Sequence, residues 1–244
     1  MSETITKMDY GRQLDDFVVG DCYLHPFEVT VDEAIVGPYC SSFIDATPLW
    51  SSDRAAQALG LKRRPVPPHL LLNLGLSFSV HDTSQQAIAH LAYVRVEFPK
   101  PLLIGGTIRA ASRVLETRPS STGDKGVVRV QTVLVDEDGQ RVLDFERMAL
   151  IRGGNLARRP QIPGATSQDD AWLGALPART FASRVVDVPP GADFFRPPLF
   201  GTFEDLTPGR IFVHANGRTV GHSEHMRLSA TVRNTHPLHW DDVY

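Results

Sequence analysis

A short segment near the carboxyl end of the chain combines two histidines with an asparagine: Asn234-Thr235-His236-Pro237-Leu238-His239-Trp240-Asp241. An imidazole has a pKa of about 6.5, so it can accept or donate a proton near neutral pH without large tuning. An asparagine amide exchanges no proton, but it can orient a water molecule or an imidazole through hydrogen bonds. The segment therefore favours general acid/base chemistry carried by a histidine and assisted by Asn234.

This segment has a counterpart near the start of the chain, because the sequence repeats at an offset of 189 positions. Residues 14–53 align with residues 203–242 without a gap. Eight of these forty positions are identical, namely Asp16/Asp205, Gly20/Gly209, His25/His214, Thr30/Thr219, Val31/Val220, Pro48/Pro237, Leu49/Leu238 and Asp53/Asp242. The ungapped frame and the clustering around turn residues indicate an internal duplication. The matched His25 and His214 favour a structural turn role for both.

In this frame each copy partly resembles the Asp-x-Asn-Pro-x-His motif of MaoC-like enoyl-CoA hydratases. The second copy matches the motif at Pro237 and His239, with Asn234 at the aspartate position. The first copy keeps the aspartate as Asp45 but has Trp50 in place of the histidine. Neither copy holds the complete pair, so the first copy is expected to be catalytically degenerate, with Asp45 as a vestige.

The wider chain resembles the mesaconyl-CoA hydratase family, also called β-methylmalyl-CoA dehydratases, over most of residues 14–244. The segments that carry this likeness are Ala58-Leu59-Gly60-Leu61, the apolar run 69–80, the turn 123–128, Val142-Leu143-Asp144-Phe145, and Glu224-His225-Met226 with Asn234-Thr235 and His239. The resemblance implies an α+β double hot-dog architecture, in which an antiparallel sheet wraps a central helix, with the second unit incomplete. It also implies reversible hydration of an enoyl-CoA, most specifically of mesaconyl-CoA to β-methylmalyl-CoA, without a metal or redox cofactor.

Hydration of an unsaturated thioester requires a base for water, an acid for Cα and donors for the enolate oxygen. The resemblance assigns the proton transfer to His239 and makes Asn234, at the aspartate position, compatible with an active site. It places the oxyanion donors at the amino end of a central helix, where the helix dipole favours negative charge. In the first copy the same place, near Pro68 and His69, is expected to shape the acyl tunnel.

Purely structural interpretations of these residues stay open. His239 can be an ordinary loop histidine, Asn234 a turn former, and His236 a structural residue. The basic run Lys62-Arg63-Arg64 either contacts the phosphates of coenzyme A or forms a solvated face. The spacing of His222, His225, His236 and His239 is not the His-Glu-x-x-His of zinc proteases, so we expect no metal.

The first copy contains the elements that would position such a site. The patterns predict a short strand or extended entry at 17–24, helices at 32–43 (interrupted at Gly37-Pro38) and 53–59, a buried helix at 69–80 that begins at Pro68, and strands at 89–98, 107–117, 126–135 and 140–152. A long apolar helix followed by an antiparallel meander is typical of a helix wrapped by a curved sheet. We expect a first unit at 14–153, a linker rich in Pro and Gly at 154–202, and the start of a second unit at 203–244.

The composition narrows the function classes. The 244 residues are 42% hydrophobic, with a net charge of −3 and two cysteines, expected to be reduced, which favours a cytoplasmic protein. No basic block indicates nucleic acid, and no apolar run or signal sequence indicates a membrane. A homo-oligomer or a partner that completes the second unit is expected. Two rival functions remain, a hot-dog acyl-CoA thioesterase and a non-catalytic acyl-CoA-binding subunit.

Overall fold

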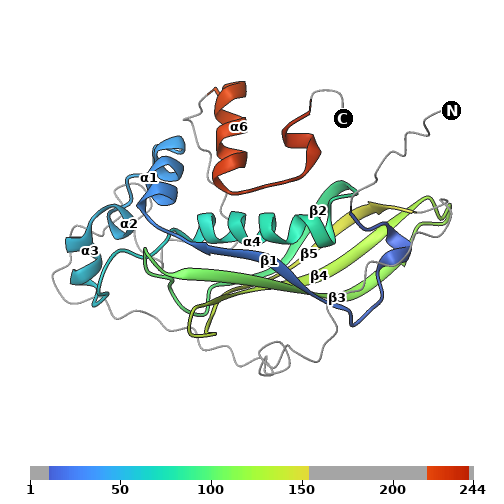
Figure 1. Ribbon diagram of the computed structural model, residues 1–244, viewed down its shortest axis with the longest axis horizontal. Helices are drawn as coiled ribbons and strands as arrows, with labels where there is room; N and C mark the ends of the chain where they lie inside the picture. Colours follow the sequence, from blue (N-terminus) through green and yellow to red (C-terminus); the bar gives the residue numbers. More distant parts are fainter. Residues whose placement is uncertain (1–10, 154–218, 242–244) are drawn as a thin grey trace, which may run out of the picture.

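The structure is a computed structural model that describes residues 11–153 and 219–241 (Figure 1). In chain order its elements are η1 (Leu14–Asp16), β1 (Cys22–Thr30), α1 (Glu33–Ser42), α2 (Pro48–Ser51), α3 (Asp53–Ala58), α4 (Pro68–Thr83), β2 (Ala87–Glu97), β3 (Thr107–Pro119), β4 (Lys125–Asp136), β5 (Arg141–Arg152), α6 (His222–Thr231) and η4 (Pro237–His239).

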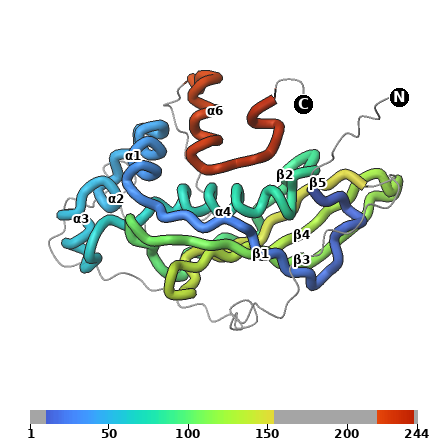
Figure 2. Tube along the Cα trace, in the orientation of Figure 1, coloured from blue at the N-terminus to red at the C-terminus, as the bar shows by residue number. Residues whose placement is uncertain are grey.

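The five strands form one antiparallel sheet in the order β1-β3-β4-β5-β2, and α4 lies along one of its faces (Figures 1 and 2). Helix and sheet meet closely at Gly75, where an added Cβ would lie 2.6 Å from Leu134 Cδ1 and 2.8 Å from Leu143 Cδ2. Leu70, Leu74 and Phe78 of α4 are fully buried in the same core. The helix wrapped by a sheet, expected from the sequence, is therefore present.

The central helix begins as predicted and ends later. Pro68 occupies the first helical position, where its missing N–H is no loss. The helix then continues beyond Val80 to Thr83, because Asp82 and Thr83 of its last turn bind His25 and Arg147 of the sheet.

The structure corrects the bounds of the first strand and the predicted break in the first helix. The first strand starts only at Cys22, because Gly20 takes a left-handed φ of 98° and donates its N–H to Val114 O, which delays pairing with β3. The helix α1 runs through Pro38 without the expected interruption. Pro38 and Ala34 are both exposed, so water can reach this part of the helix, where Pro38 has no N–H to donate to the Ala34 carbonyl. Asp32 caps this helix as predicted, by accepting the Ala34 N–H at 3.0 Å.

The described part of the second copy consists of α6 and η4, and α6 packs beside α1 (Figure 1). At the offset of 189, the bounds of α1 coincide with those of α6. Val232, at the end of α6, is buried in the core around α4, and Leu228 packs against it. The predicted linker at 154–202 and the predicted start of the second unit at 203 lie outside the described residues, so the domain limits stay a prediction.

Candidate active site

The loop after α6 turns on a residue with a left-handed backbone. Arg233 has φ of 60°, and the next N–H, that of Asn234, donates to Ser229 O at 3.0 Å. The Asn234 Oδ1 accepts the His236 N–H at 3.0 Å, and the Asn234 carbonyl accepts Trp240 Nε1 at 2.7 Å. One end of the Asn234 amide therefore shapes the turn, and its Nδ2 has no acceptor among the described residues.

His239 closes η4 and is half-buried. Its Nδ1 lies 3.4 Å from His225 Nε2, and the two ring centroids are 5.4 Å apart. Burial, and next the neighbouring His225, lower the pKa of His239 below its ordinary value. An imidazole with a lowered pKa is neutral at pH 7 and can accept a proton.

His236 is the more buried of the two motif histidines, at 8% exposure. Its Nδ1 accepts the Leu238 N–H at 3.1 Å and so caps η4. Beside it, Thr235 binds Gln85, which follows α4: Gln85 Nε2 donates to Thr235 O at 3.4 Å. The contacts of His236 support the structural role considered for it, and those of Thr235 hold the loop near the carboxyl end of α4.

The same turn recurs in the first copy around Asp45. The Asp45 N–H donates to Cys40 O at 2.9 Å, and Asp45 Oδ1 accepts the N–H and hydroxyl of Thr47 at 3.0 and 2.7 Å. Asp45 Oδ2 accepts Trp50 Nε1 at 2.8 Å. Burial acts to raise the pKa of Asp45, but the hydrogen bonds from Thr47 and Trp50 and the nearby His69 outweigh it, so the pKa is lowered.

His69, in the first turn of α4, faces this carboxylate. Its Nε2 lies 3.5 Å from Asp45 Oδ2, and its ring stacks on Tyr39 with centroids 5.4 Å apart. Burial lowers the pKa of His69, while Asp45 acts to raise it. Asp45 and His69 are 24 positions apart in the chain, so the sequence alone gives no signal that they are in contact.

The basic run lies just before α4. Arg64 pairs with Glu33, and its Nε lies 3.1 Å from Asp53 Oδ1. Arg63 NH1 donates to Ile104 O at 3.0 Å, and Lys62 is exposed. Arg64 therefore holds the segment against α1 and α3, which leaves Lys62 and Arg63 as the residues able to meet an anion.

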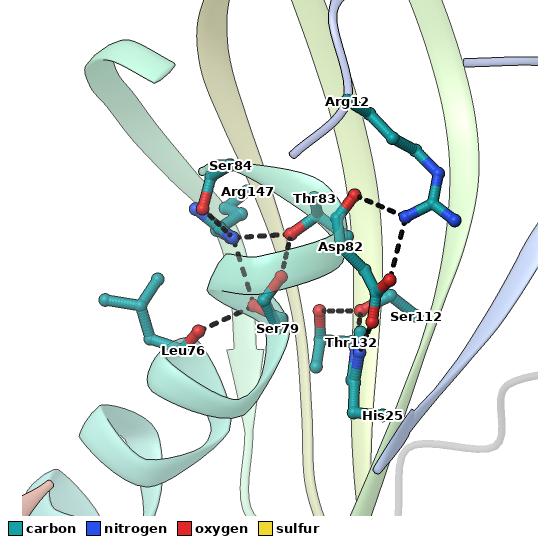
Figure 3. A network of polar contacts seen from close by, with 10 residues as sticks. All are labelled: Arg12, His25, Leu76, Ser79, Asp82, Thr83, Ser84, Ser112, Thr132 and Arg147. Carbon is teal, nitrogen blue, oxygen red and sulfur yellow. Dashed lines mark hydrogen bonds and ion pairs between the residues drawn. The ribbon is translucent and has the colours of Figure 1, made fainter. Parts of the chain in front are cut away.

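A buried polar network lies under the carboxyl half of α4 (Figure 3). His25, with no side-chain exposure, lies between Asp82 Oδ2 and Ser112 Oγ, each at 2.8 Å. This resembles a catalytic triad, but His25 and Ser112 are both buried from any substrate, so the role is structural. His25 was expected at a turn, but it lies within strand β1.

Arg147 of β5 anchors the same end of α4. Its Nη2 donates to Ser79 Oγ, Thr83 Oγ1 and Ser84 Oγ at 3.0, 2.8 and 2.9 Å (Figure 3). Burial lowers its pKa to about 10, so the side chain remains a cation at neutral pH. A cation is favoured at a helix carboxyl terminus, which fastens α4 to the sheet beside Gln85.

Metal ligands, thiols and membrane helices were sought among the described residues. No group of three or more His, Cys, Asp or Glu side chains in residues 11–153 and 219–241 is arranged to hold a metal ion. Cys22 and Cys40 are free thiols. Among the described helices, none has the length and apolar character to cross a membrane.

Comparison with known proteins agrees with this architecture. The model of the mesaconyl-CoA hydratase family matches residues 2–171. A mesaconyl-CoA hydratase of Cereibacter sphaeroides is 30% identical over 240 residues, which cover 96% of this chain and 67% of the relative. A structure described as a MaoC domain protein dehydratase, from Chloroflexus aurantiacus, superimposes with a TM-score of 0.70 at 25% identity, covering 97% of this chain and 66% of that one. A double hot-dog protein of Mycobacterium tuberculosis superimposes with a TM-score of 0.68 at 19% identity, over 95% and 69% of the two chains.

The curved antiparallel sheet around α4 and these likenesses define an α+β protein of the MaoC-like hot-dog fold, as the sequence predicted. The chain belongs to the mesaconyl-CoA hydratase family, which is a family of hydro-lyases. It spans about two thirds of the length of the relatives it matches.

Proposed function

We propose that this chain catalyses the reversible addition of water to an enoyl-CoA thioester, with mesaconyl-CoA and β-methylmalyl-CoA as the preferred pair. The observation that carries the proposal is the matched loop geometry of the two copies. It presents a half-buried His239, with a lowered pKa, in the place that corresponds to Trp50 of the first copy.

In this proposal His239 takes a proton from water while the water oxygen bonds to Cβ. The π electrons of the Cα=Cβ bond move toward the thioester carbonyl, and the imidazolium then returns a proton to Cα. Asn234 Nδ2 donates a hydrogen bond to the water or to the thioester oxygen, because its Oδ1 is already occupied by His236 N–H. We propose in addition that Lys62 and Arg63 contact the phosphates of coenzyme A.

The thioesterase alternative is less favoured, because such an enzyme would need a carboxylate on the central helix. Residues 69–80 carry none, and Asp82, further along α4, is held by His25 and Arg12. Release of free thiol from a CoA ester would support a thioesterase. Tight binding of butyryl-CoA without any turnover would support the non-catalytic subunit.

The test is loss of the conjugated thioester when the full chain is mixed with mesaconyl-CoA or crotonyl-CoA. Replacement of a general acid/base typically lowers the rate on the order of 10²-fold or more, so His239→Gln should do so, and Asn234→Ala should lower it less. His222→Gln, an exposed histidine of α6, is the matched control. A His239→Gln chain with the wild-type rate would remove this residue from the mechanism.

We also propose that the chain assembles through β2, as a homo-oligomer. In the described sheet β2 pairs only with β5, so its outer edge offers unpaired backbone groups. Its surroundings expose apolar side chains at 39–48%, namely Ile88, Leu91, Tyr93, Val94 and Phe98. A second copy that pairs along this edge would cover them.

A cytoplasmic location is likewise a proposal, which fractionation of the native cells would test.

A further inference from the structure

Asp45 and His69 form a carboxylate–imidazole pair in the copy that the sequence predicts to be degenerate. His69 Nε2 is 3.5 Å from Asp45 Oδ2, and the His69 side chain is 42% exposed. A proton on Nε2 would face the carboxylate, which leaves Nδ1 as the basic nitrogen, with no hydrogen-bond partner in the described part of the chain. Catalytic hydrogen bonds are often long in ligand-free structures and shorten when substrate binds, so a separation of 3.5 Å is compatible with a working pair.

The pair is held by the side chains around it. Thr47 and Trp50 occupy the other acceptor positions of Asp45, so the carboxylate stays ionised and oriented. The indole of Trp50 meets the His69 ring edge-on, with centroids 5.9 Å apart, and Tyr39 stacks on it. Trp50 thus replaces the histidine of the motif in sequence, while His69 supplies an imidazole from another element.

This pair is distinct from the loop of the second copy. His69 lies in the first turn of α4, whereas Thr235 binds Gln85 just beyond the last turn. Fourteen residues of α-helix separate His69 from Thr83, which at 1.5 Å per residue is about 20 Å. The two motif loops therefore serve opposite ends of α4, as the separation of α2 and η4 in Figure 1 also shows.

Two features, one close to His69 in sequence and one in contact with its ring, suit an acyl thioester with a phosphate-bearing carrier. Lys62 and Arg63, the exposed members of the basic run, precede His69 by seven and six positions in the chain. Phe43, 49% exposed, lies with its ring centroid 6.3 Å from that of His69 and offers an apolar surface to an acyl chain.

We propose that Asp45 and His69 form a second acid/base site, which hydrates a small unsaturated acyl thioester of a phosphate-bearing carrier. This substrate class rests on the function proposed above. His69 Nδ1 takes a proton from water as the water oxygen bonds to Cβ and the Cα=Cβ π bond breaks. The imidazolium, stabilised by Asp45, returns a proton to Cα, so that one water is added and nothing is oxidised or reduced.

The test uses the full chain, with crotonyl-CoA, in a His239→Gln background that removes the other imidazole. A residual hydration rate should remain, and His69→Gln or Asp45→Asn should lower it on the order of 10²-fold, the usual share of a general acid/base. His81→Gln, an exposed histidine of the same helix, is the control, and melting curves show that each variant folds. The His69 imidazole, titrated by NMR, should lose a proton at lower pH in Asp45→Asn, because the carboxylate that favours its charged form is gone.

No residual rate in His239→Gln overturns the second site, and so does a residual rate that His69→Gln leaves unchanged. A His69 titration that is the same with and without the Asp45 carboxylate overturns the pairing. By contrast, a wild-type rate that survives His239→Gln but falls with His69→Gln supports the second site and counts against the role of His239 alone.

Discussion

Ile44 and Arg233 share a left-handed backbone, with φ of 54° and 60°, at positions that the internal repeat superimposes. Each residue directly precedes the polar side chain of its motif, Asp45 or Asn234. A β-branched residue is unfavourable in this conformation, and such strain persists only where the surrounding structure imposes it. The turn is therefore a shared feature of both copies, independent of the side chain that carries it.

Replacement of Ile44 by asparagine should stabilise the fold. Ile44 is 77% exposed, so little packing is lost, while asparagine tolerates a left-handed φ better. We expect the free energy of unfolding in urea to rise by about 1 kcal/mol. Ile88→Asn, at an exposed strand position, is the control and should show no such gain; an equal or lower stability of Ile44→Asn would contradict the argument.

The acid limb of the pH–rate profile should depend on His225. Burial and then His225 lower the pKa of His239, so the neutral base persists to pH values below about 6.5. His225→Gln removes the second of these effects and should move the acid limb of kcat/KM to higher pH. His222→Gln should leave the limb in place, and an unchanged limb in His225→Gln would exclude the pair as a tuning device.

Stability should fall on the acid side because of His25. Burial lowers its pKa in the folded state, so below about pH 6.5 the unfolded chain binds a proton that the folded chain does not. The unfolding free energy therefore decreases as the pH falls from about 6.5 toward the folded pKa. His25→Gln should flatten this dependence below about pH 6.5 in urea titrations, at a cost in stability at pH 7.5 from the broken network.

The control for that measurement is His81→Gln, which removes an exposed histidine from α4 and should keep the wild-type slope. A slope in His25→Gln as steep as that of the wild type would mean that other groups carry the acid sensitivity.

Charge placed on β2 should prevent assembly through that edge. Leu91 is 47% exposed on the outer strand. Leu91→Lys would place a charge in the proposed interface, where pairing of the two edges would bury it. Sedimentation should show a smaller species at equal protein concentration. Leu24→Lys, on the opposite edge strand β1, should leave the wild-type size; a monomeric wild type would rule out this assembly.

The elements of the first copy were largely predictable because their signals are local. The helix start at Pro68, the cap at Asp32 and the four later strands follow from residue type and alternation over short windows. The delayed start of β1 was missed because it depends on how Gly20 meets Val114 of a distant strand.

In the candidate site, too, local features were predictable from the sequence and long-range contacts were not. The sequence alone determined the repeat, the motif loop and the family resemblance, because these depend only on the order of residues. Only the tertiary structure decided that His69 faces Asp45, that Arg64 is already engaged by Asp53 and Glu33, and that Thr235 rests on Gln85. Contacts between residues far apart in the chain form when α4 packs on the sheet, and no local pattern encodes which side chains then meet.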